Sequence, residues 1–139
     1  MNTLRVLVVD DSEVIRRGVC TLLEGQPELV VSIACDGLEA VQQAQEQQPD
    51  VILLDIGLPR LNGIEAARRI RRVAPESKIL FLSQYDTWAT AREALKTGAA
   101  GYVVKSDAAS ELIQGVWSVY EGKSFVSSTL AANDPRAVH

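Results

Sequence analysis

Five short apolar runs alternate along the chain with segments that have the spacing of amphipathic helices, and this alternation constrains the fold more than any other feature. The runs are residues 4–9, 29–34, 51–54, 78–82 and 101–104. Several of them lack the apolar and polar alternation of a strand with one wet face, which is typical of strands covered on both faces. In the intervening segments apolar residues recur at intervals of three and four, as expected for helices that pack on a sheet.

The pattern predicts an α/β fold, a (βα)5 open sandwich built on a parallel five-stranded sheet. A chain of 139 residues has room for one such domain, because domains usually contain roughly 100–200 residues. The alternation ends near Gly122, after which small, polar and proline residues predominate. We therefore expect one domain over residues 1–122 and a C-terminal linker over residues 123–139.

Composition argues against several classes of protein. The 14 Lys and Arg residues against 18 Asp and Glu residues leave a net charge of −4, without the basic stripe expected of a nucleic-acid-binding protein. No apolar run approaches the roughly 18 residues of a membrane span, and the N-terminus has acids where a signal peptide has small residues. We expect a cytoplasmic protein with no membrane or direct nucleic-acid partner. Cys20 and Cys35 lack metal-ligand spacing and are expected to be buried, reduced thiols.

Four of the five apolar runs lead directly into polar residues that can carry chemistry. Asp10 and Asp11 come after the first run, Asp55 after the third, Ser83 after the fourth and Lys105 after the fifth. Right-handed crossovers place the carboxyl ends of parallel strands on one edge, which is where open α/β sheets bind ligands. We expect these five side chains to converge there.

A site with three clustered carboxylates needs a counter-charge, because the acids repel one another. All the candidate ligands are hard oxygens without added His or Cys, so Mg²⁺ or Mn²⁺ is favoured over zinc. A divalent ion held by acids beside Lys105 is typical of a phosphoryl-transfer site, in which the lysine would neutralise the transferred charge.

Taken singly, each of these residues has a structural explanation. Asp10 and Asp11 precede a helix and can cap it or offset its dipole. Asp55 and Ser83 can be turn residues, and Lys105 can be a solvated surface charge. The functional interpretation rests on their coincidence, because unrelated caps and turns need not place acids, a hydroxyl and an amine at one edge of a sheet.

Four stretches of the chain resemble the receiver domain of two-component response regulators. They are VLVVDDSE at 6–13, DVILLDIGLPRLNGIEAARRIR at 50–71, KILFLSQYD at 78–86 and GAAGYVVKSD at 98–107. The resemblance covers residues 4–121 and is closest to receivers that precede a LuxR-type helix-turn-helix, as in the NarL/FixJ group. It implies the flavodoxin-like fold with strand order 2-1-3-4-5.

The resemblance assigns the acidic residues to phosphorylation. It makes Asp55 the phosphoacceptor, which takes a phosphoryl group from a phosphohistidine of a partner histidine kinase, from a phosphotransfer protein or from a small phosphodonor. Asp10 and Asp11 become the acidic pair for Mg²⁺, with Asp11 the more direct ligand. The backbone carbonyl of Gly57 and the carboxylate of Asp55 complete the protein ligands.

The resemblance also implies how the phosphoryl group is read. Ser83 would hydrogen-bond one phosphoryl oxygen and Lys105 would pair with another. The switch aromatic falls on Tyr102, which would turn into space that Ser83 vacates and so couple the site to the face made by the fourth helix, fifth strand and fifth helix. Catalysis would be limited to the chain's own phosphorylation and dephosphorylation, so we do not expect an enzyme.

Three positions depart from, or vary within, the receiver pattern. Many receivers follow the lysine with a cis proline, whereas Ser106 follows Lys105 here, and the cost of a cis bond before a non-proline leaves its geometry open. Gly57 and Tyr85 hold positions that in the family modulate how fast the phosphoryl group is lost. No phosphoryl lifetime follows from these residues.

The output of such a receiver has two interpretations. The family expectation is control of transcription through a C-terminal DNA-binding domain outside this chain. The alternative is a stand-alone receiver that acts as a phosphorelay shuttle or regulates a protein target. Trp117 and Tyr120 widen the apolar stripe of the last helix; they either pack over the sheet or form a homodimer or partner surface, with packing the simpler interpretation.

Two other classes fit the residues less well. A haloacid-dehalogenase-type phosphatase also uses an aspartyl nucleophile, but it needs a second acid two residues later, where this chain has Gly57. A flavodoxin-like flavin binder needs a Ser, Thr or Gly phosphate loop after the first strand, where Asp10 and Asp11 would repel the flavin phosphate.

Overall fold

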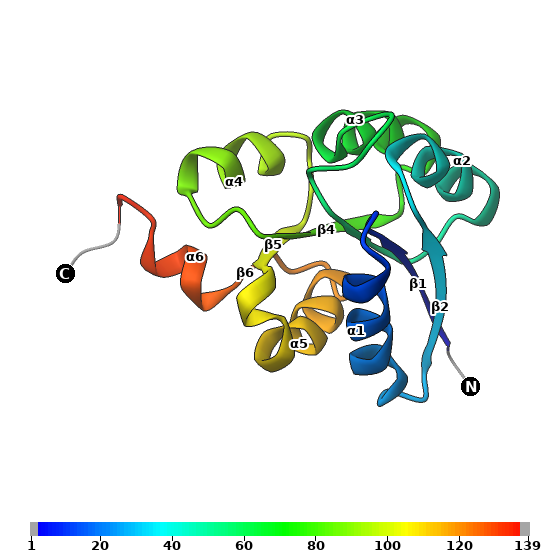
Figure 1. Ribbon diagram of the computed structural model, residues 1–139, viewed down its shortest axis with the longest axis horizontal. Coiled ribbons are helices and arrows are strands. Elements are labelled where there is room, and N and C mark those ends of the chain that lie inside the picture. Colours follow the sequence, from blue (N-terminus) through cyan, green and yellow to red (C-terminus); the bar gives the residue numbers. More distant parts are fainter. Residues whose placement is uncertain (1–2, 137–139) are drawn as a thin grey trace.

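The strands form one parallel sheet in the order β2-β1-β3-β4-β5-β6 in a computed structural model that describes residues 3–136 (Figure 1). Their bounds are β1 Leu4–Val9, β2 Leu29–Ala34, β3 Val51–Leu54, β4 Lys78–Ser83, β5 Gly101–Val104 and β6 Phe125–Val126. The predicted (βα)5 sheet and its order 2-1-3-4-5 are confirmed, and a short sixth strand extends the sheet beyond β5.

Helices cover both faces of this sheet, as its apolar strands predicted. Their bounds are α1 Glu13–Glu24, α2 Gly37–Gln47, α3 Gly63–Val73, α4 Trp88–Leu95, α5 Ala108–Tyr120 and α6 Ser128–Ala132. Figure 1 shows α1 and α5 below the sheet and α2, α3 and α4 above it. Within residues 3–136 there is no helix with both the length and the apolar character needed to cross a bilayer.

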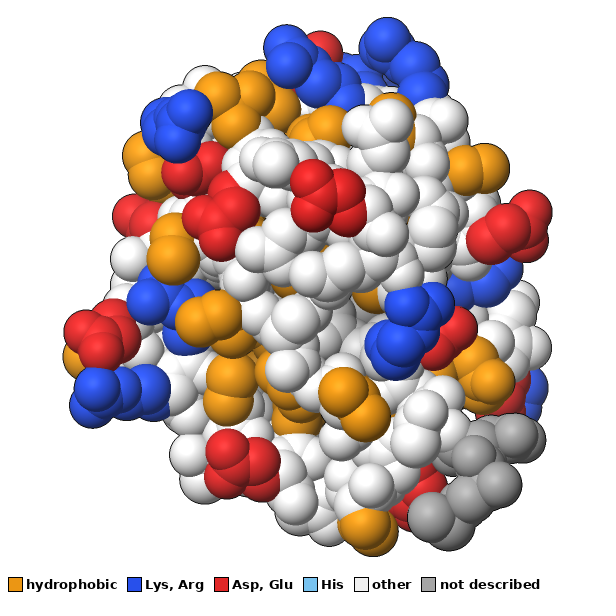
Figure 2. Space-filling view, turned by 90° about the vertical axis from the view of Figure 1, so that its right-hand side faces the viewer, with side chains coloured by type: hydrophobic (Ala, Val, Ile, Leu, Met, Phe, Trp, Pro, Cys, Tyr) orange, Lys and Arg blue, Asp and Glu red, His pale blue; other side chains and the backbone are white. Residues whose placement is uncertain are grey.

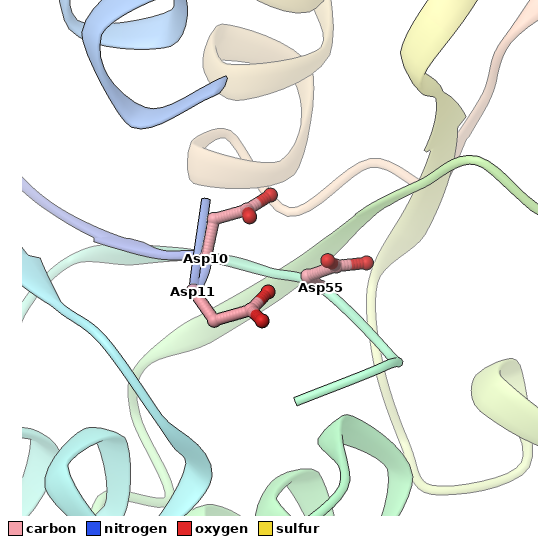
Figure 3. Close-up of side chains that lie close together, drawn as sticks. All are labelled: Asp10, Asp11 and Asp55. Atoms are coloured by element: carbon pink, nitrogen blue, oxygen red, sulfur yellow. The ribbon is translucent and has the colours of Figure 1, made fainter. Parts of the chain in front are cut away.

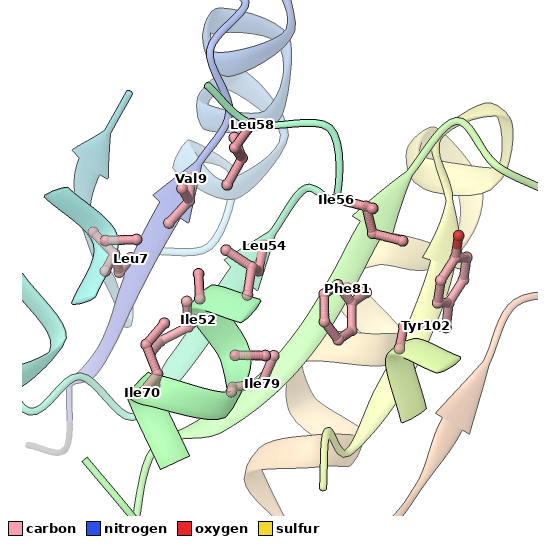
Figure 4. Packing of buried hydrophobic residues seen from close by; sticks show 14 of the residues in the cluster. Leu7, Val9, Ile52, Leu54, Ile56, Leu58, Ile70, Ile79, Phe81 and Tyr102 are labelled. Atoms are coloured by element: carbon pink, nitrogen blue, oxygen red, sulfur yellow. The ribbon is translucent and has the colours of Figure 1, made fainter. Parts of the chain in front are cut away.

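Two apolar clusters hold the layers together, one on each face of the sheet. Alternate residues of one strand enter different clusters, so that Ile52 and Leu54 face α3 while Val51 and Leu53 face α1 and α5. Figure 4 shows side chains of the first cluster, which project from β1, β3, β4 and β5 on the same face of the sheet as Ile70 of α3. Burying one such side chain stabilises the fold by about 1.5–3 kcal/mol, so the central strands are held firmly on both sides.

The edge strand β2 is the least covered of the long strands. Val30 and Ile33 are 54% and 45% exposed, and Figure 2 shows hydrophobic side chains interspersed with charged ones on this side of the molecule. The prediction of two buried thiols is wrong. Cys35 follows this edge strand and is exposed, and Cys20 in α1 is only half-buried.

Polar caps begin α1, α2 and α3, three of the helices that follow strands of the sheet. The side chains of Ser12, Asp36 and Asn62 accept hydrogen bonds from backbone N–H groups three residues later, at 3.3, 2.8 and 3.0 Å. Each cap is followed by a glutamate in the first turn of its helix, which favours the helix dipole. These caps fix where α1, α2 and α3 begin.

The C-terminal segment differs from the linker expected over residues 123–139. Phe125 and Val126 pair with β5. Leu130 of α6 is fully buried in the apolar cluster to which Ala91 and Ala94 of α4 also belong. Sequence periodicity could not indicate elements of two and five residues, because neither is long enough to repeat. Residues 137–139 of the expected linker lie outside the described residues.

Candidate functional site

A hollow of about 360 Å³ lies at the carboxyl ends of β1, β3 and β5. Its lining includes Asp10, Asp11, Asp55, Gly57 and Lys105. These five residues come from three separate parts of the chain, the segments that follow β1, β3 and β5, as the shared strand edge predicted. Ser83 is not part of the lining, because its side chain is fully buried.

The three aspartates form a tight acidic cluster. One carboxylate oxygen from each of Asp10, Asp11 and Asp55 lies within 4.8 Å of the others. Figure 3 shows the carboxylates of Asp11 and Asp55 turned toward the same space. Asp10 and Asp55 are buried, while Asp11 is exposed. This set of hard oxygen donors suits a hard divalent cation.

Lys105 is the counter-charge of the cluster. Its Nζ lies 2.7 Å from Oδ2 of Asp10 and 3.1 Å from Oδ2 of Asp55. Burial works against the charge of Lys105, but the hydrogen bonds and charges of the two aspartates outweigh it and raise the pKa of the lysine. The ammonium therefore stays charged and bridges the ends of β1 and β3.

Asp55 is fixed by its neighbours on both oxygens. Oδ1 accepts a hydrogen bond from the backbone N–H of Ile56 at 2.8 Å, and Oδ2 accepts one from Lys105. Burial, the largest influence, raises the pKa of Asp55 above its usual value, and the charge of Asp10 adds to this, against the opposing effect of Lys105. The carboxylate is therefore harder to ionise than a solvated one, and Lys105 is the group that favours its charged form.

Asp10 supports the start of α1 as well as the cluster. Its Oδ1 accepts a hydrogen bond from Ser12 N at 2.9 Å, and its backbone carbonyl accepts one from Arg16 at 2.7 Å. One carboxylate oxygen of Asp10 thus holds the backbone just before α1, while the other, Oδ2, faces Lys105.

Ser83 and Tyr102 lie behind the hollow. The Ser83 hydroxyl oxygen accepts a hydrogen bond from Tyr85 N at 3.2 Å, and the Tyr102 hydroxyl donates to the backbone carbonyl of Tyr85 at 2.7 Å. Tyr102 is already fully buried, beside Phe81 with ring centroids 6.2 Å apart. The structure therefore has the tyrosine in the inward position that we expected it to adopt only after Ser83 moves.

The turn after Lys105 has an ordinary backbone. The chain has no cis peptide bond among residues 3–136, so the Lys105–Ser106 bond is trans. Residues Lys105–Asp107 form one turn of 3₁₀ helix that leads into α5.

Gly63 supports the site and was not predicted to do so. A Cβ on this residue would lie 1.8 Å from the backbone oxygen of Asp55, and the Gly63 N–H donates to the carbonyl of Ile56 at 2.7 Å. The first turn of α3 therefore packs directly against the strand end that carries Asp55. Gly63 is the first residue of α3, so no local sequence signal distinguishes it from a glycine at an ordinary helix start.

Comparison with known proteins agrees with this geometry. The model of the response regulator receiver domain family matches residues 6–116. The transcriptional regulatory protein DegU of Brevibacillus brevis is 37% identical over 133 residues, which cover 95% of this chain and 56% of that protein. The chain thus spans little more than half of the length of this relative.

Solved structures give the same result. A LuxR-family two-component response regulator from Aurantimonas sp. SI85-9A1 is 34% identical, with a TM-score of 0.90 and 95% of each chain covered. The response regulator domain of Thermotoga maritima CheB is 35% identical, with a TM-score of 0.80, covering 86% of this chain and 98% of that one. The match of the family model over most of the chain, together with these relatives, shows that the chain belongs to the receiver domain family of two-component response regulators.

Proposed function

We propose that Asp55 is the phosphoacceptor of this receiver and that a divalent ion, Mg²⁺ or Mn²⁺, assists the transfer. The observation that carries the proposal is that Asp55 lines the same hollow as Asp10 and Asp11, while the Nζ of Lys105 lies 3.1 Å from Asp55 Oδ2. An acceptor, a set of metal ligands and a fixed ammonium are the groups that phosphoryl transfer requires.

The charges of the site support a divalent ion. Three carboxylates and one ammonium leave a net charge of −2 in the hollow, which would repel an anionic phosphodonor. Asp10, Asp11 and Asp55, with the Gly57 backbone carbonyl, would hold the ion. When bound, it would neutralise the acids and share its coordination with phosphoryl oxygens.

The chemical step is an in-line displacement at phosphorus. A carboxylate oxygen of Asp55 attacks, and the bond from phosphorus to the imidazole nitrogen of a phosphohistidine breaks. The electron pair stays on that nitrogen, which then takes a proton from solvent. Lys105 pairs with a phosphoryl oxygen, for which it must leave its present contact with Asp55.

Ser83 would transmit the phosphorylation of Asp55 to the neighbouring loop. Its hydroxyl accepts from Tyr85 N, and turning it toward a phosphoryl oxygen would release the loop that also holds the Tyr102 hydroxyl. The change would spread to α4 and β5, which would couple phosphorylation of Asp55 to the face made by α4, β5 and α5. A change from mostly inactive to mostly active requires about 5 kcal/mol of differential stabilisation, which a few charge-assisted hydrogen bonds can supply.

The biological role proposed here is that of a cytoplasmic response regulator. A histidine kinase or a phosphotransfer protein would phosphorylate residues 1–122, and the output would be transcription through a DNA-binding domain outside this chain. The description of DegU as a transcriptional regulatory protein supports this output. A stand-alone receiver that acts in a phosphorelay is the second candidate, and a DNA-binding domain in the same gene would exclude it.

The exposed part of the apolar stripe on α5 decides whether the chain has a surface for a homodimer. Trp117 is half-buried and packs on the α1 and α5 face, while Tyr120 is 43% exposed with its ring 6.1 Å from Trp117. The apolar stripe of α5 is thus mostly used inside the fold. Light scattering over a concentration series, with and without phosphodonor, would show any dimer, and an unchanged mass would remove it from the proposal.

The experiment that tests the acceptor uses the whole chain with acetyl phosphate and Mg²⁺. Intact-protein mass should show one added phosphoryl group, which Asp55→Asn abolishes. Asp50→Asn is the matched control, because Asp50 precedes the same strand at its opposite end. Equal labelling of Asp55→Asn and the wild-type chain would overturn the assignment.

A further inference from the structure

The C-terminal segment contacts two loops of the site in addition to covering the sheet edge. We name residues 125–136 the C-terminal clasp: they comprise β6, Ser127, α6 and the four residues that follow α6. Figure 1 shows α6 at the edge of the sheet opposite β2, next to α4 and α5. The two ends of the clasp reach different loops, and each loop follows a residue that would bind phosphate.

The near end of the clasp holds the backbone on both sides of Lys105. The Ser127 hydroxyl, which is fully buried, accepts a hydrogen bond from Val104 N at 2.9 Å. Thr129 donates twice to the carboxylate of Asp107, from its N–H at 3.0 Å and from its hydroxyl at 2.7 Å. Lys105 lies between these two attachments, directly after the first and two residues before the second.

The far end of the clasp holds the loop that follows Ser83. The Asn133 side-chain amide donates to the backbone carbonyl of Asp86 at 2.9 Å. The Arg136 guanidinium lies over the Trp88 ring, 5.1 Å from its centroid, within the range of a cation–π contact. The same loop carries Tyr85, whose N–H and carbonyl hold the hydroxyls of Ser83 and Tyr102.

A purely structural account would have the clasp hide the edge of β5 and bury Leu130. Those tasks need backbone pairing and one apolar side chain, and β6 and α6 supply both. They do not need side-chain hydrogen bonds to Val104, Asp107 and Asp86. One further side-chain bond, from Ser128 N to Glu111 of α5 at 3.1 Å, only holds the start of α6. The bonds to Val104, Asp107 and Asp86 are made to segments close to Lys105 and Ser83, and that placement calls for a second role.

We propose that the C-terminal clasp is a positioning element of the phosphorylation site, which holds Lys105 through Ser127 and Thr129 and the loop after Ser83 through Asn133 and Arg136. This inference rests on the proposed function of Asp55. It assigns no chemistry to the clasp, since none of these four side chains lines the hollow. Because coupling is reciprocal, a phosphoryl group that moves Lys105 or Ser83 also changes how tightly the clasp is held.

The test uses the full chain with Thr129→Val, which removes one hydroxyl at nearly constant shape. Thr21→Val is the matched control, because the Thr21 hydroxyl bonds only within α1, to the Arg17 carbonyl at 2.9 Å. We expect Thr129→Val to slow labelling by acetyl phosphate about threefold to tenfold, below the 10²-fold of a 1 Å misplacement. Its Mg²⁺ affinity should stay within about twofold of the wild-type value, because the carboxylate ligands are untouched. The double variant of Asn133→Ala with Arg136→Ala should also slow labelling.

A structural role alone would give a different result. It predicts that Thr129→Val lowers the urea midpoint. Labelling rate and Mg²⁺ affinity would then either fall together or both stay unchanged. Either of these two results overturns the inference and leaves the proposed function standing. A wild-type chain that takes no phosphoryl group would instead refute the proposed function. Even then the position of Lys105 remains measurable, since its Nζ NMR signal should shift in Thr129→Val and not in Thr21→Val; an unshifted signal overturns the clasp.

Discussion

The two sides of the site are held by different parts of the molecule. The acidic side, Asp10, Asp11 and Asp55, follows the central strands β1 and β3, which are covered on both faces. The other side, which we propose binds the phosphoryl group and call the phosphate-binding side, consists of Ser83, the last residue of β4, and Lys105, which follows β5. It lies next to the edge that the C-terminal segment covers. In the proposed function the acidic side holds the ion and the phosphate-binding side responds to phosphorylation, so the response can change while the ion stays in place.

Removal of the lysine should separate the two sides most sharply. We expect Lys105→Ala to slow labelling by acetyl phosphate about 10²- to 10³-fold, the usual cost of losing a charge-stabilising group. The same variant should bind Mg²⁺ more tightly, because Asp10 and Asp55 lose their competing ammonium. Labelling kinetics and calorimetry measure the two effects. Weaker Mg²⁺ binding would show that the sides are not separable, and the exposed Lys123→Ala is the control.

Gly63→Ala should break the acidic side instead. The new Cβ would meet the Asp55 backbone oxygen at 1.8 Å, and overpacking of this kind costs about 1–3 kcal/mol. We expect a lower free energy of unfolding in urea together with weaker Mg²⁺ binding. Gly18→Ala in α1 is the matched control: its Cβ meets nothing within 4 Å, so it should stabilise the chain by about 0.5–1 kcal/mol. Equal stability of the two variants would contradict the close approach.

A smaller effect is expected from Tyr102→Phe on the phosphate-binding side. The change removes the 2.7 Å hydrogen bond to the Tyr85 carbonyl, which is worth about 1 kcal/mol. Urea unfolding should show this loss, while Mg²⁺ affinity stays unchanged because the ring does not line the hollow. A change in Mg²⁺ affinity would mean that the tyrosine acts on the acidic side as well.

The smallest expected effect is on the pH dependence of stability. The folded-state pKa of Asp55 is raised, so the folded chain binds more protons than the unfolded chain, and Asp55 lowers stability as pH rises from its unfolded value through its folded value. We therefore expect Asp55→Asn to unfold at higher urea than the wild-type chain at pH 7, with the difference shrinking toward pH 4. A difference that grows in acid would reverse the sign of this prediction.

The sequence predicted the residues that meet better than it predicted how they are held. Asp10, Asp55 and Lys105 converge because strands of alternating βα units end at one edge, a rule that needs no side-chain detail. The bounds of β1, β2, β3 and β5 agree with the apolar runs, and β4 is one residue longer because Ser83 still pairs with β5.

The remaining features depend on contacts between distant residues. The buried position of Tyr102 and its bond to Tyr85 depend on rotamers that no local pattern specifies. The strand and helix within residues 125–132 depend on the free edge of β5, which exists only once the sheet has formed. Gly63 looked like a residue of an ordinary helix start, because its close neighbour is a backbone atom eight residues away.

Close backbone packing also affects how a mutational scan of this chain would read. A Cβ on Gly37 would lie 1.9 Å from the Leu61 carbonyl oxygen, much as one on Gly63 would strike Asp55. Neither glycine has a side chain to take part in phosphorylation, yet no other residue fits at either position without a shift of backbone. A screen scored on signalling would therefore rank positions 37 and 63 as intolerant as position 55. Screening for folded protein in parallel would tell them apart, since only position 55 should accept asparagine there.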